Sequence, residues 1–354
     1  MRLAICGLGA AARNLHIPAY KRLADVELVG GCDPDLNARE MFRNEVPALF
    51  DDLARMLDEL HPDAVTICTP PSLHHQHVML ALDRGCHVFV EKPLCETLQQ
   101  ADEMIRRSEI VNRRVVVNTQ FPNMRIYRAA KKQIGSDEFG RLLFIHAWQT
   151  FDVNAKTEAS WRGELKRRVS FEFGVHVFDL IRYFFDAEPV RLFAHMPSPL
   201  GLSQCDTVNT IALEFSDGRA ASIVLDRLSR GPERYLELRL DGEFAAVQTS
   251  IGGSLELRAG IEPRRRRPFV RLDIAGGGKA VLQKGEKSRL IAREGLSPFS
   301  EATGLLFQEF LQEIAIGKLS RSTVTEHRKT LALVLAAYQS AEEGRVVDLQ
   351  QSHG

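Results

Sequence analysis

The chain has no excess of charge of either sign: its 354 residues hold 46 Lys and Arg and 46 Asp and Glu. Without a net field, neither nucleic acid nor an acidic membrane is expected as a general partner. No apolar run approaches the roughly 18 to 20 residues that a membrane helix needs. The N-terminal residues also lack the basic, apolar and small-residue zones of a secretory signal. We therefore expect a cytoplasmic protein that binds neither nucleic acid nor membrane.

Cysteine is scarce and forms no C-x-x-C pair. Most of it lies in the N-terminal part of the chain, in or beside runs that predict buried strands: Cys6, Cys32, Cys68, Cys86 and Cys95, with Cys205 apart. We interpret these residues as small core side chains instead of a disulfide framework. The closely spaced His74, His75 and His77 have no cysteine or acidic partner at ligand spacing, so no metal site is predicted.

Short apolar runs alternate with amphipathic stretches over the first third of the chain. Runs such as Val115-Val116-Val117 lack polar alternation, which is typical of parallel strands covered on both faces. The predicted strands are 2–6, 26–32, 63–68, 87–90 and 114–118, and the predicted helices are 12–24, 35–44, 51–60, 73–84 and 97–112. Residues 1–122 are thus predicted to form an α/β, doubly wound Rossmann domain.

Strands of alternating polarity dominate the remainder, residues 123–354. They are predicted at 142–151, 190–195, 207–215, 220–228 and 235–240, with helices near 170–185, 303–316 and 324–343. Asp217-Gly218 and Asp241-Gly242 are hairpin signals. This pattern predicts an α+β domain with one mostly antiparallel sheet. Because so few helices cannot cover both of its faces, we expect the open face to be buried in a homodimer or homotetramer.

A glycine turn follows the first predicted strand and opens a helix, which is the context of a dinucleotide-binding fingerprint. Gly7 permits the tight turn, Gly9 lets a pyrophosphate approach the backbone, and Ala12 allows close helix packing. We assign Leu8, Ala10 and Ala11 to the same cofactor turn. An ordinary tight loop is the alternative.

The second predicted strand ends at Asp33, whose carboxylate could accept hydrogen bonds from a ribose diol. A carboxylate there repels a 2′-phosphate, so NAD is favoured over NADP. Arg39 could still reach a 2′-phosphate and leaves NADP open.

Two further strands end in motifs at the same predicted edge of the sheet. The loop that carries Thr69, Pro70 and His74 follows the third buried strand and should flank the cofactor. Glu91-Lys92-Pro93 follows the next one. Lysine is the cation whose pKa burial can lower, so Lys92 at this edge predicts a reactive amine in a nicotinamide enzyme.

Glu172, His176 and Asp179 stand at i, i+4 and i+7 of a helix that is otherwise apolar. A carboxylate beside an imidazole has the outline of a general-base pair, and alcohol oxidation by NAD requires the hydroxyl proton to be removed. A solvated polar stripe on the helix is the alternative.

Taken together, these motifs resemble the glucose-fructose oxidoreductase / inositol dehydrogenase (Gfo/Idh/MocA) family over nearly the whole chain. The resemblance extends to His16-Ile17-Pro18-Ala19, Trp161-Arg162 and the closing Ala336-Ala337-Tyr338-Gln339-Ser340-Ala341. It implies that the second domain has an open-faced sheet used for substrate binding and subunit contact. It further implies that Lys92 contacts the substrate hydroxyl, that His176 is the catalytic acid/base with Glu172 beside it, and that Glu91, Lys92 and Arg162 join the cofactor site.

Two departures from the family pattern concern the substrate. Glu172 stands where the family usually has Asp, and the usual Gly-Gly-Gly run before this helix is missing. A basic connection that includes Lys166, Arg167 and Arg168 replaces it. Arginine binds carboxylate or phosphate in a bidentate manner, so this connection favours an anionic substrate. A solvated surface loop is the alternative.

The sequence therefore predicts an NAD(P)-dependent oxidoreductase that acts on a secondary alcohol or ketone of a sugar, cyclitol or sugar derivative. The same residues would serve an epimerase or eliminase that retains its cofactor and oxidises the substrate transiently. A nucleotide-binding subunit that has lost turnover is a third reading.

Overall fold

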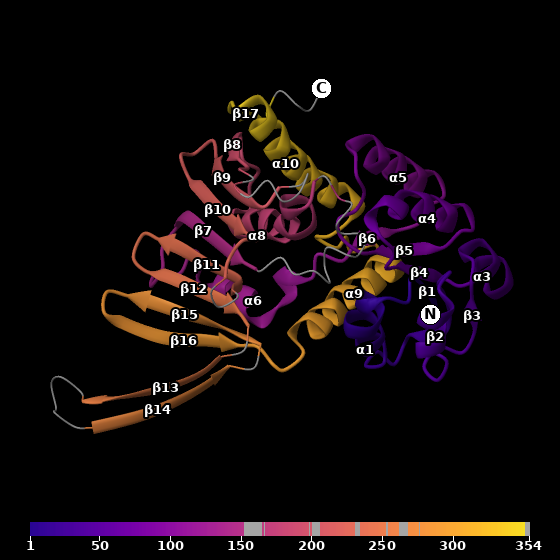
Figure 1. The fold of residues 1–354 in the computed structure, drawn as a ribbon, viewed down its shortest axis with the longest axis horizontal. Coiled ribbons are helices and arrows are strands. Elements are labelled where there is room, and N and C mark those ends of the chain that lie inside the picture. Colours follow the sequence, from indigo (N-terminus) through magenta and orange to yellow (C-terminus); the bar gives the residue numbers. More distant parts are fainter. Residues whose placement is uncertain are drawn as a thin grey trace. The chain divides into compact units, whose positions relative to one another are not determined.

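The computed structural model describes residues 1–151, 165, 167–197, 199, 206–230, 234–252, 254–261, 268–275 and 277–350 (Figure 1). The chain divides into two compact units, and each is built from separated segments. The first holds 1–123, 170–180 and 299–336, and the second holds 124–169, 181–298 and 337–354. The sequence predicts a single boundary after residue 122. In the structure two later segments join the N-terminal unit as well.

A six-stranded parallel sheet forms the centre of the first unit, as the sequence predicts for a Rossmann domain. Its order is β3-β2-β1-β4-β5-β6, with β1 (Arg2–Cys6), β2 (Glu27–Cys32), β3 (Leu49–Phe50), β4 (Ala64–Ile67), β5 (His87–Val90) and β6 (Val115–Val117). All residues of β4 and β6 are buried, which confirms that uninterrupted apolar runs marked strands covered on both faces. The two-residue β3 was not predicted.

The helices of this unit lie close to their predicted ranges. They include the π-helical turn η1 (Ala12–His16), α1 (Ile17–Tyr20), α2 (Leu36–Met41), α3 (Leu53–Leu60), α4 (Pro71–Asp83), α5 (Leu98–Ile110) and α9 (Pro298–Ile316), together with the 3₁₀ turn η2 (Phe121–Asn123), which was not predicted. The start of α8 (Val175–Phe185) and most of α10 (Val324–Glu343) also belong to this unit. Side-chain caps start three of them: Asp35 for α2, Asp52 for α3, and Thr97, with a full capping box, for α5.

Helix α9 explains why a segment so distant in sequence belongs to the first unit. Its Phe307 and Phe310 pack against Phe89 of β5, with ring centroids 5.0 and 5.6 Å away. Its Gly304 faces Ala19 of α1, and Figure 1 shows the two helices side by side. Aromatic rings bury large apolar areas, so this cluster fixes α9 to the sheet.

A nine-stranded sheet forms the second unit, in the order β16-β15-β12-β11-β7-β10-β9-β8-β17. Its strands are β7 (Leu142–Thr150), β8 (Arg191–His195), β9 (Val208–Glu214), β10 (Ala220–Asp226), β11 (Arg234–Gly242), β12 (Ala246–Ile251), β15 (Gly278–Lys284), β16 (Lys287–Arg293) and β17 (Val347–Asp348). Only β7 and β10 pair in parallel, so the prediction of a mostly antiparallel sheet is confirmed. A separate hairpin joins β13 (Ser254–Ile261) to β14 (Pro268–Ala275).

Burial alternates along these strands, which shows that one face of the sheet is covered. Residues of α6 (Arg125–Gln133), the end of α8 (Val175–Phe185) and the end of α10 (Val324–Glu343) cover it. On the other face Trp148 is 38% exposed and Phe193 43% exposed. The open face predicted from the shortage of helices is therefore present.

Within the described residues no helix is long and apolar enough to cross a membrane. Cys6, Cys32, Cys68, Cys86 and Cys95 are free thiols, and Cys205 lies outside the described residues.

Candidate active site

The glycine turn lies at the carboxyl end of β1, where a parallel sheet binds ligands. Gly7 has φ +90°, and a Cβ there would lie 2.8 Å from the carbonyl carbon of Cys68. Only glycine fits such a backbone in so tight a space. A Cβ on Gly9, in contrast, would meet nothing within 4 Å. The space over Gly9 is thus open, as a pyrophosphate requires.

The residues after Gly9 pass into a wide helical turn. Ala10 is exposed, Ala11 is half-buried and Ala12 is fully buried against the sheet. Residues Ala12–His16 are π-helical, where the sequence predicts an ordinary α-helix. Single π-turns often mark functional sites because they redirect side chains out of α-helical register.

Asp33 closes the glycine turn from the end of β2. Its carboxylate accepts hydrogen bonds from the backbone N–H of Leu8 at 2.8 Å and of Asp35 at 2.9 Å. A carboxylate has about four acceptor positions, so capacity for a ribose diol remains. Arg39 donates to the carbonyl oxygens of Asp33 and Pro34, which keeps a guanidinium beside the same strand end.

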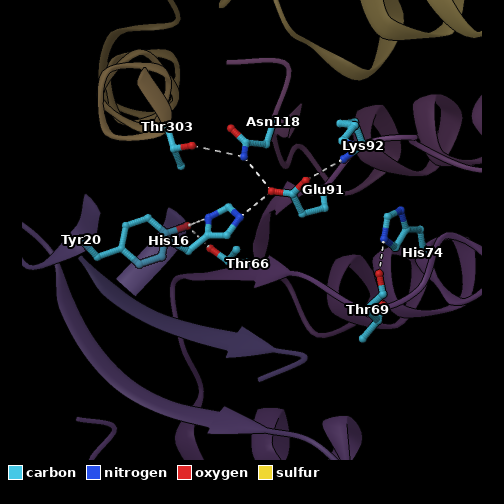
Figure 2. A network of polar contacts seen from close by, with 9 residues as sticks. All are labelled: His16, Tyr20, Thr66, Thr69, His74, Glu91, Lys92, Asn118 and Thr303. Atoms are coloured by element: carbon cyan, nitrogen blue, oxygen red, sulfur yellow. Dashed lines mark hydrogen bonds and ion pairs between the residues drawn. The ribbon is translucent and has the colours of Figure 1, made fainter. Parts of the chain in front are cut away.

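His74 connects two loops at this edge of the sheet. Its ring is fully buried, with Nδ1 2.8 Å from the carbonyl oxygen of Pro93 and Nε2 2.8 Å from that of Thr69. Burial lowers the pKa of His74, although the two carbonyls act to raise it. Figure 2 shows the contact with Thr69, and the contact with Pro93 links the same loop to the residue after Lys92. Its assignment to the cofactor stays a prediction.

Glu91 turns its carboxylate into a buried polar network (Figure 2). Its Oε1 accepts hydrogen bonds from Nε2 of His16 and Nδ2 of Asn118, both at 2.7 Å. The Nδ1 atom of His16 lies 2.9 Å from the Tyr20 hydroxyl, which lies 2.6 Å from Oγ1 of Thr66. Every ring nitrogen and hydroxyl in this chain of contacts has a partner, so the network fixes its members tightly.

The pKa of Glu91 is held below its ordinary value by this network. Burial acts to raise it, but the hydrogen bond and charge of His16, the charge of Lys92 and the amide of Asn118 outweigh that effect. Glu91 is therefore an anion at neutral pH. Burial raises the pKa of Tyr20 far above its ordinary value, so its hydroxyl keeps its proton.

Lys92 is half-buried, and its ammonium is directed at the helix that carries the candidate base. Its Nζ donates to the backbone carbonyl of Glu172 at 2.9 Å and lies 5.9 Å from the ring centroid of Phe173. Its own backbone N–H donates to Oε2 of Glu91 at 3.3 Å. Both ends of Lys92 are thus anchored within the first unit.

The predicted pair of Glu172 and His176 stays a prediction, and the structure bears on one ring nitrogen of His176 only. Among the described residues the buried Nδ1 of His176 has no hydrogen-bond partner. Residues Val169–Gly174 form a second π-helical turn, η4. A π-turn has a wider repeat than an α-helix, so the i, i+4 spacing on which the prediction was based is altered at Glu172. Asp179, the third member of the stripe, instead pairs with Arg321 at 3.0 and 3.2 Å.

His176 lies flat against an aromatic ring beside a cation. Its imidazole stacks on Phe121 with centroids 4.0 Å apart and planes 3° from parallel. Burial, followed by the charge of Lys92 and the ring of His327, holds the pKa of His176 well below its ordinary value. The imidazole is therefore neutral at neutral pH, the form that can accept a proton.

Sequence reasoning missed the residues that follow β6. Asn118, Thr119 and Gln120 are buried polar residues, and Phe121 supports His176. Three consecutive polar residues directly after a buried strand were the available signal, because carboxyl ends of parallel strands meet at one edge.

The basic connection is only partly described. Lys166 lies outside the described residues, as do Arg162 and Trp161. Arg167, whose side chain is 48% exposed, lies 3.6 Å from Glu342 and over the ring of Tyr338. Arg168 is buried and its backbone N–H donates to Asp206 at 2.7 Å. Within the second unit, Arg167 thus interacts with α10.

Two family models match this chain. Residues 1–119 match "Oxidoreductase family, NAD-binding Rossmann fold", and residues 127–248 match "GFO/IDH/MocA C-terminal domain". The chain belongs to the Gfo/Idh/MocA family. This Gfo/Idh/MocA oxidoreductase carries its NAD-binding Rossmann domain at the N-terminus, and the open turn over Gly9 fits that cofactor.

Several relatives of this Gfo/Idh/MocA protein are named as dehydrogenases, and others are named as a hydratase and a glycosyl hydrolase. It is 38% identical over 106 residues to D-glucoside 3-dehydrogenase of Escherichia coli (strain K12), a match that spans 29% of this chain and 30% of the relative. It is 26% identical over 323 residues to 1-carboxy-3-chloro-3,4-dihydroxycyclo hexa-1,5-diene dehydrogenase of Comamonas testosteroni, which spans 82% of this chain and 81% of the relative.

A solved structure shares the fold over nearly the entire chain. It is an oxidoreductase from Agrobacterium radiobacter in complex with NAD+, L-tartaric acid and magnesium. The TM-score is 0.84 at 19% identity, and 99% of each chain is covered. At this identity the likeness shows the fold alone.

Proposed function

We propose that this oxidoreductase transfers a hydride between NAD and a secondary alcohol or ketone of a polyhydroxylated small molecule. One observation carries the proposal: the imidazole of His176 is buried and stacked on Phe121, and burial together with the charge of Lys92 lowers its pKa. Both groups belong to the unit that has the open glycine turn. A base and a fixed cation together supply what alcohol oxidation needs besides its cofactor.

Each residue has a distinct role in this proposal. Lys92 hydrogen-bonds the reacting oxygen and stabilises the charge that develops as its proton leaves. His176 accepts that proton through Nε2, since its Nδ1 is buried. The backbone carbonyl of Glu172 receives the Lys92 ammonium and so helps to orient the lysine. The ring of Phe121 keeps the imidazole plane fixed.

The cofactor site in this proposal is the edge formed by the glycine turn, Asp33 and the Thr69-Pro70 loop. Gly7 through Ala12 would hold the pyrophosphate, and Asp33 would bind the adenosine ribose. NAD supplies the hydride acceptor at its nicotinamide ring. Arg162 stays a predicted contributor that lies outside the described residues.

The proposed substrate is a sugar, a cyclitol or a derivative of either. Two named relatives act on a glucoside and on a carboxylated cyclic diol, and a solved relative binds tartrate. Two of these three molecules are carboxylates, which supports the anionic option. Arg167 already contacts Glu342, so binding of an anionic substrate depends less on Arg167 than the sequence predicts.

The test is a panel of neutral and carboxylated polyols incubated with the protein and NAD, with NADH formation and products both measured. We expect at least one member to yield a ketone with stoichiometric NADH. Conversion without net NADH would indicate a cofactor-retaining epimerase or eliminase instead. Cofactor binding without any conversion would indicate an inactive subunit. His176→Ala is the matched variant.

We propose that a second copy of this chain covers the open face of the nine-stranded sheet, giving a homodimer or homotetramer. Trp148 and Phe193 lie on that face, and large exposed apolar groups favour burial. Trp148→Glu combined with Phe193→Glu should produce a monomer by light scattering. Leu296→Glu, at a 91% exposed position outside the sheet, is the control. A monomeric unmodified protein would refute this proposal.

Localisation in the cytoplasm stays a prediction, and fractionation of cells that express the tagged chain would test it.

A further inference from the structure

His16 is fully buried in the first unit and is not part of the reaction as proposed. It closes the π-helical turn η1, which begins with the last residue of the glycine turn. Its Nε2 lies 2.7 Å from Oε1 of Glu91, the residue directly before Lys92. One side chain therefore joins the cofactor turn to the strand end that presents the reactive amine (Figure 2).

The direction of the His16–Glu91 hydrogen bond follows from the charge of the acceptor. An ionised carboxylate can only accept, so Nε2 of His16 carries a proton and donates it to Oε1. Such a charge-assisted hydrogen bond is about twice as strong as a neutral one. Asn118 donates to the same oxygen, and the pair fixes the carboxylate in one orientation.

The fixed carboxylate in turn holds Lys92. Its second oxygen, Oε2, accepts the backbone N–H of Lys92 at 3.3 Å, so the side chain of Glu91 folds back onto the next peptide group. The ammonium at the other end of Lys92 meets the carbonyl of Glu172 at 2.9 Å. Rotation of the Glu91 carboxylate would therefore release the contact that holds the backbone N–H of Lys92.

We propose that His16 is a positioning residue for Lys92, acting through the carboxylate of Glu91. Its donor Nε2 holds the carboxylate that anchors the lysine, while its place in η1 links that anchor to the cofactor turn. Lys92 is set in place before substrate arrives. This inference rests on the proposed function only where it predicts turnover. The placement of the lysine itself can be measured without any reaction.

The two nitrogens of His16 can be separated by substitution, because each has a different partner. A glutamine amide can occupy the place of Nε2 and still donate to Glu91. An asparagine amide reaches the place of Nδ1 and can meet only Tyr20. His16→Gln therefore keeps the contact that we consider essential, and His16→Asn removes it. His16→Leu fills much of the same space without a donor, so a packing role alone predicts slow labelling in that variant, and the positioning role predicts fast labelling.

The measurement is the labelling rate of Lys92 by a small amine-reactive ester, followed by mass spectrometry of its peptide without cofactor or substrate. We expect His16→Asn to raise this rate about tenfold, the factor carried by one hydrogen bond to a charged group. His16→Gln should restore slow labelling. His75→Gln is the matched control, because Nε2 of His75 lies 2.9 Å from a carboxylate oxygen of Glu103, away from Glu91 and Lys92.

Equal labelling rates of Lys92 in the asparagine and glutamine variants would overturn the proposal. A labelling rate in His16→Asn equal to that of the unmodified protein would overturn it as well. Thermal unfolding identifies variants that fail to fold. If His16→Asn fails, Asn118→Ser removes the second donor to the same oxygen and should raise labelling by a similar factor.

Turnover then separates this inference from the proposed function. If labelling responds as expected but no polyol reduces NAD, the proposed function fails and the positioning role stands. If a polyol is oxidised by His16→Asn with unmodified kcat, the positioning role fails and the proposed function stands. Where both hold, kcat should fall about tenfold in His16→Asn with the KM for NAD within a few-fold, and recover in His16→Gln.

Discussion

Two buried histidines, each in or next to a π-helical turn, have opposite surroundings. His16 ends η1 and has a partner for both ring nitrogens, Glu91 on one side and Tyr20 on the other. His176 follows η4, and among the described residues its buried Nδ1 has no partner. Its ring rests on Phe121, a hydrocarbon surface.

The difference indicates which of the two histidines stabilises the structure and which one is available for the reaction. A fully bonded buried histidine strengthens the fold around it, whereas a buried nitrogen without a partner costs free energy. The proposed base is the other nitrogen of His176, Nε2, so the cost of the buried Nδ1 falls on a ring that serves a ligand. We therefore assign holding to His16 and chemistry to His176. The four predictions below test that division, beginning with the largest effect.

Removal of the Lys92 ammonium or the His176 imidazole should lower turnover without weakening cofactor binding. Lys92→Ala and His176→Ala should lower kcat by about 10²- to 10⁴-fold, the usual loss for a positioned acid/base or charge stabiliser. NAD affinity, measured by titration, should stay within a few-fold. Near-normal kcat in His176→Ala would refute the assigned chemistry.

Replacing each histidine by phenylalanine should affect stability in the opposite order to activity. The His16 variant should lose more stability than the His176 variant. His16→Phe removes one hydrogen-bond donor from the buried Glu91 carboxylate and should destabilise the protein by about 1.5 to 3 kcal/mol. His176→Phe removes an unpartnered nitrogen and extends the stack on Phe121, so stability should hold or rise by about 1 kcal/mol. Denaturant unfolding measures both. Equal losses of stability in the two variants would contradict the assignment of a stabilising role to His16 and not to His176.

The two glycines of the turn that leads into η1 offer a related contrast. Gly7→Ala forces a side chain into positive φ and against the Cys68 backbone, so it should cost roughly 2 to 4 kcal/mol of stability. Gly9→Ala places its methyl in open space and should leave unfolding unchanged. It should weaken NAD binding about tenfold or more, because the pyrophosphate needs that space. Unaltered NAD affinity in Gly9→Ala would show that the pyrophosphate does not bind over Gly9.

Much of this arrangement could be predicted from the chain alone. The strand that ends at Cys6 and the strand His87–Val90 are found as predicted, because unbroken β-branched and apolar runs mark covered parallel strands. Lys92 and the glycine turn fall at the expected edge, because parallel strands present their carboxyl ends together.

The π-turns and the polar network were beyond sequence reasoning. The pairing of Glu172 with His176 assumed an α-helical repeat, and nothing local in Val169–Gly174 signals a wider turn. The partners of Glu91 are separated from it by tens of residues, at His16 and Asn118. Such contacts arise only when distant strands assemble. The α9 segment joined the first unit for the same reason.

The smallest expected effect concerns pH. A histidine whose pKa is lowered by folding binds its proton more readily in the unfolded chain. Stability therefore falls as pH drops below the ordinary value of 6.5, until the pH reaches the native pKa. His176 should contribute about 1 kcal/mol per pH unit to this slope. His176→Phe should make the slope of unfolding free energy against pH shallower, and an unchanged slope would mean that the ring is not neutral in the native state.

The most direct test of the account is the rate of NADH formation with the best polyol of the panel, measured against pH for the unmodified protein and for His176→Ala. A neutral base with a lowered pKa predicts that the unmodified protein keeps its rate to a pH below the ordinary histidine pKa, and that the variant is slower by about 10²- to 10⁴-fold throughout. A variant with near-normal rates, or an unmodified rate that already falls above pH 6.5, would contradict the account.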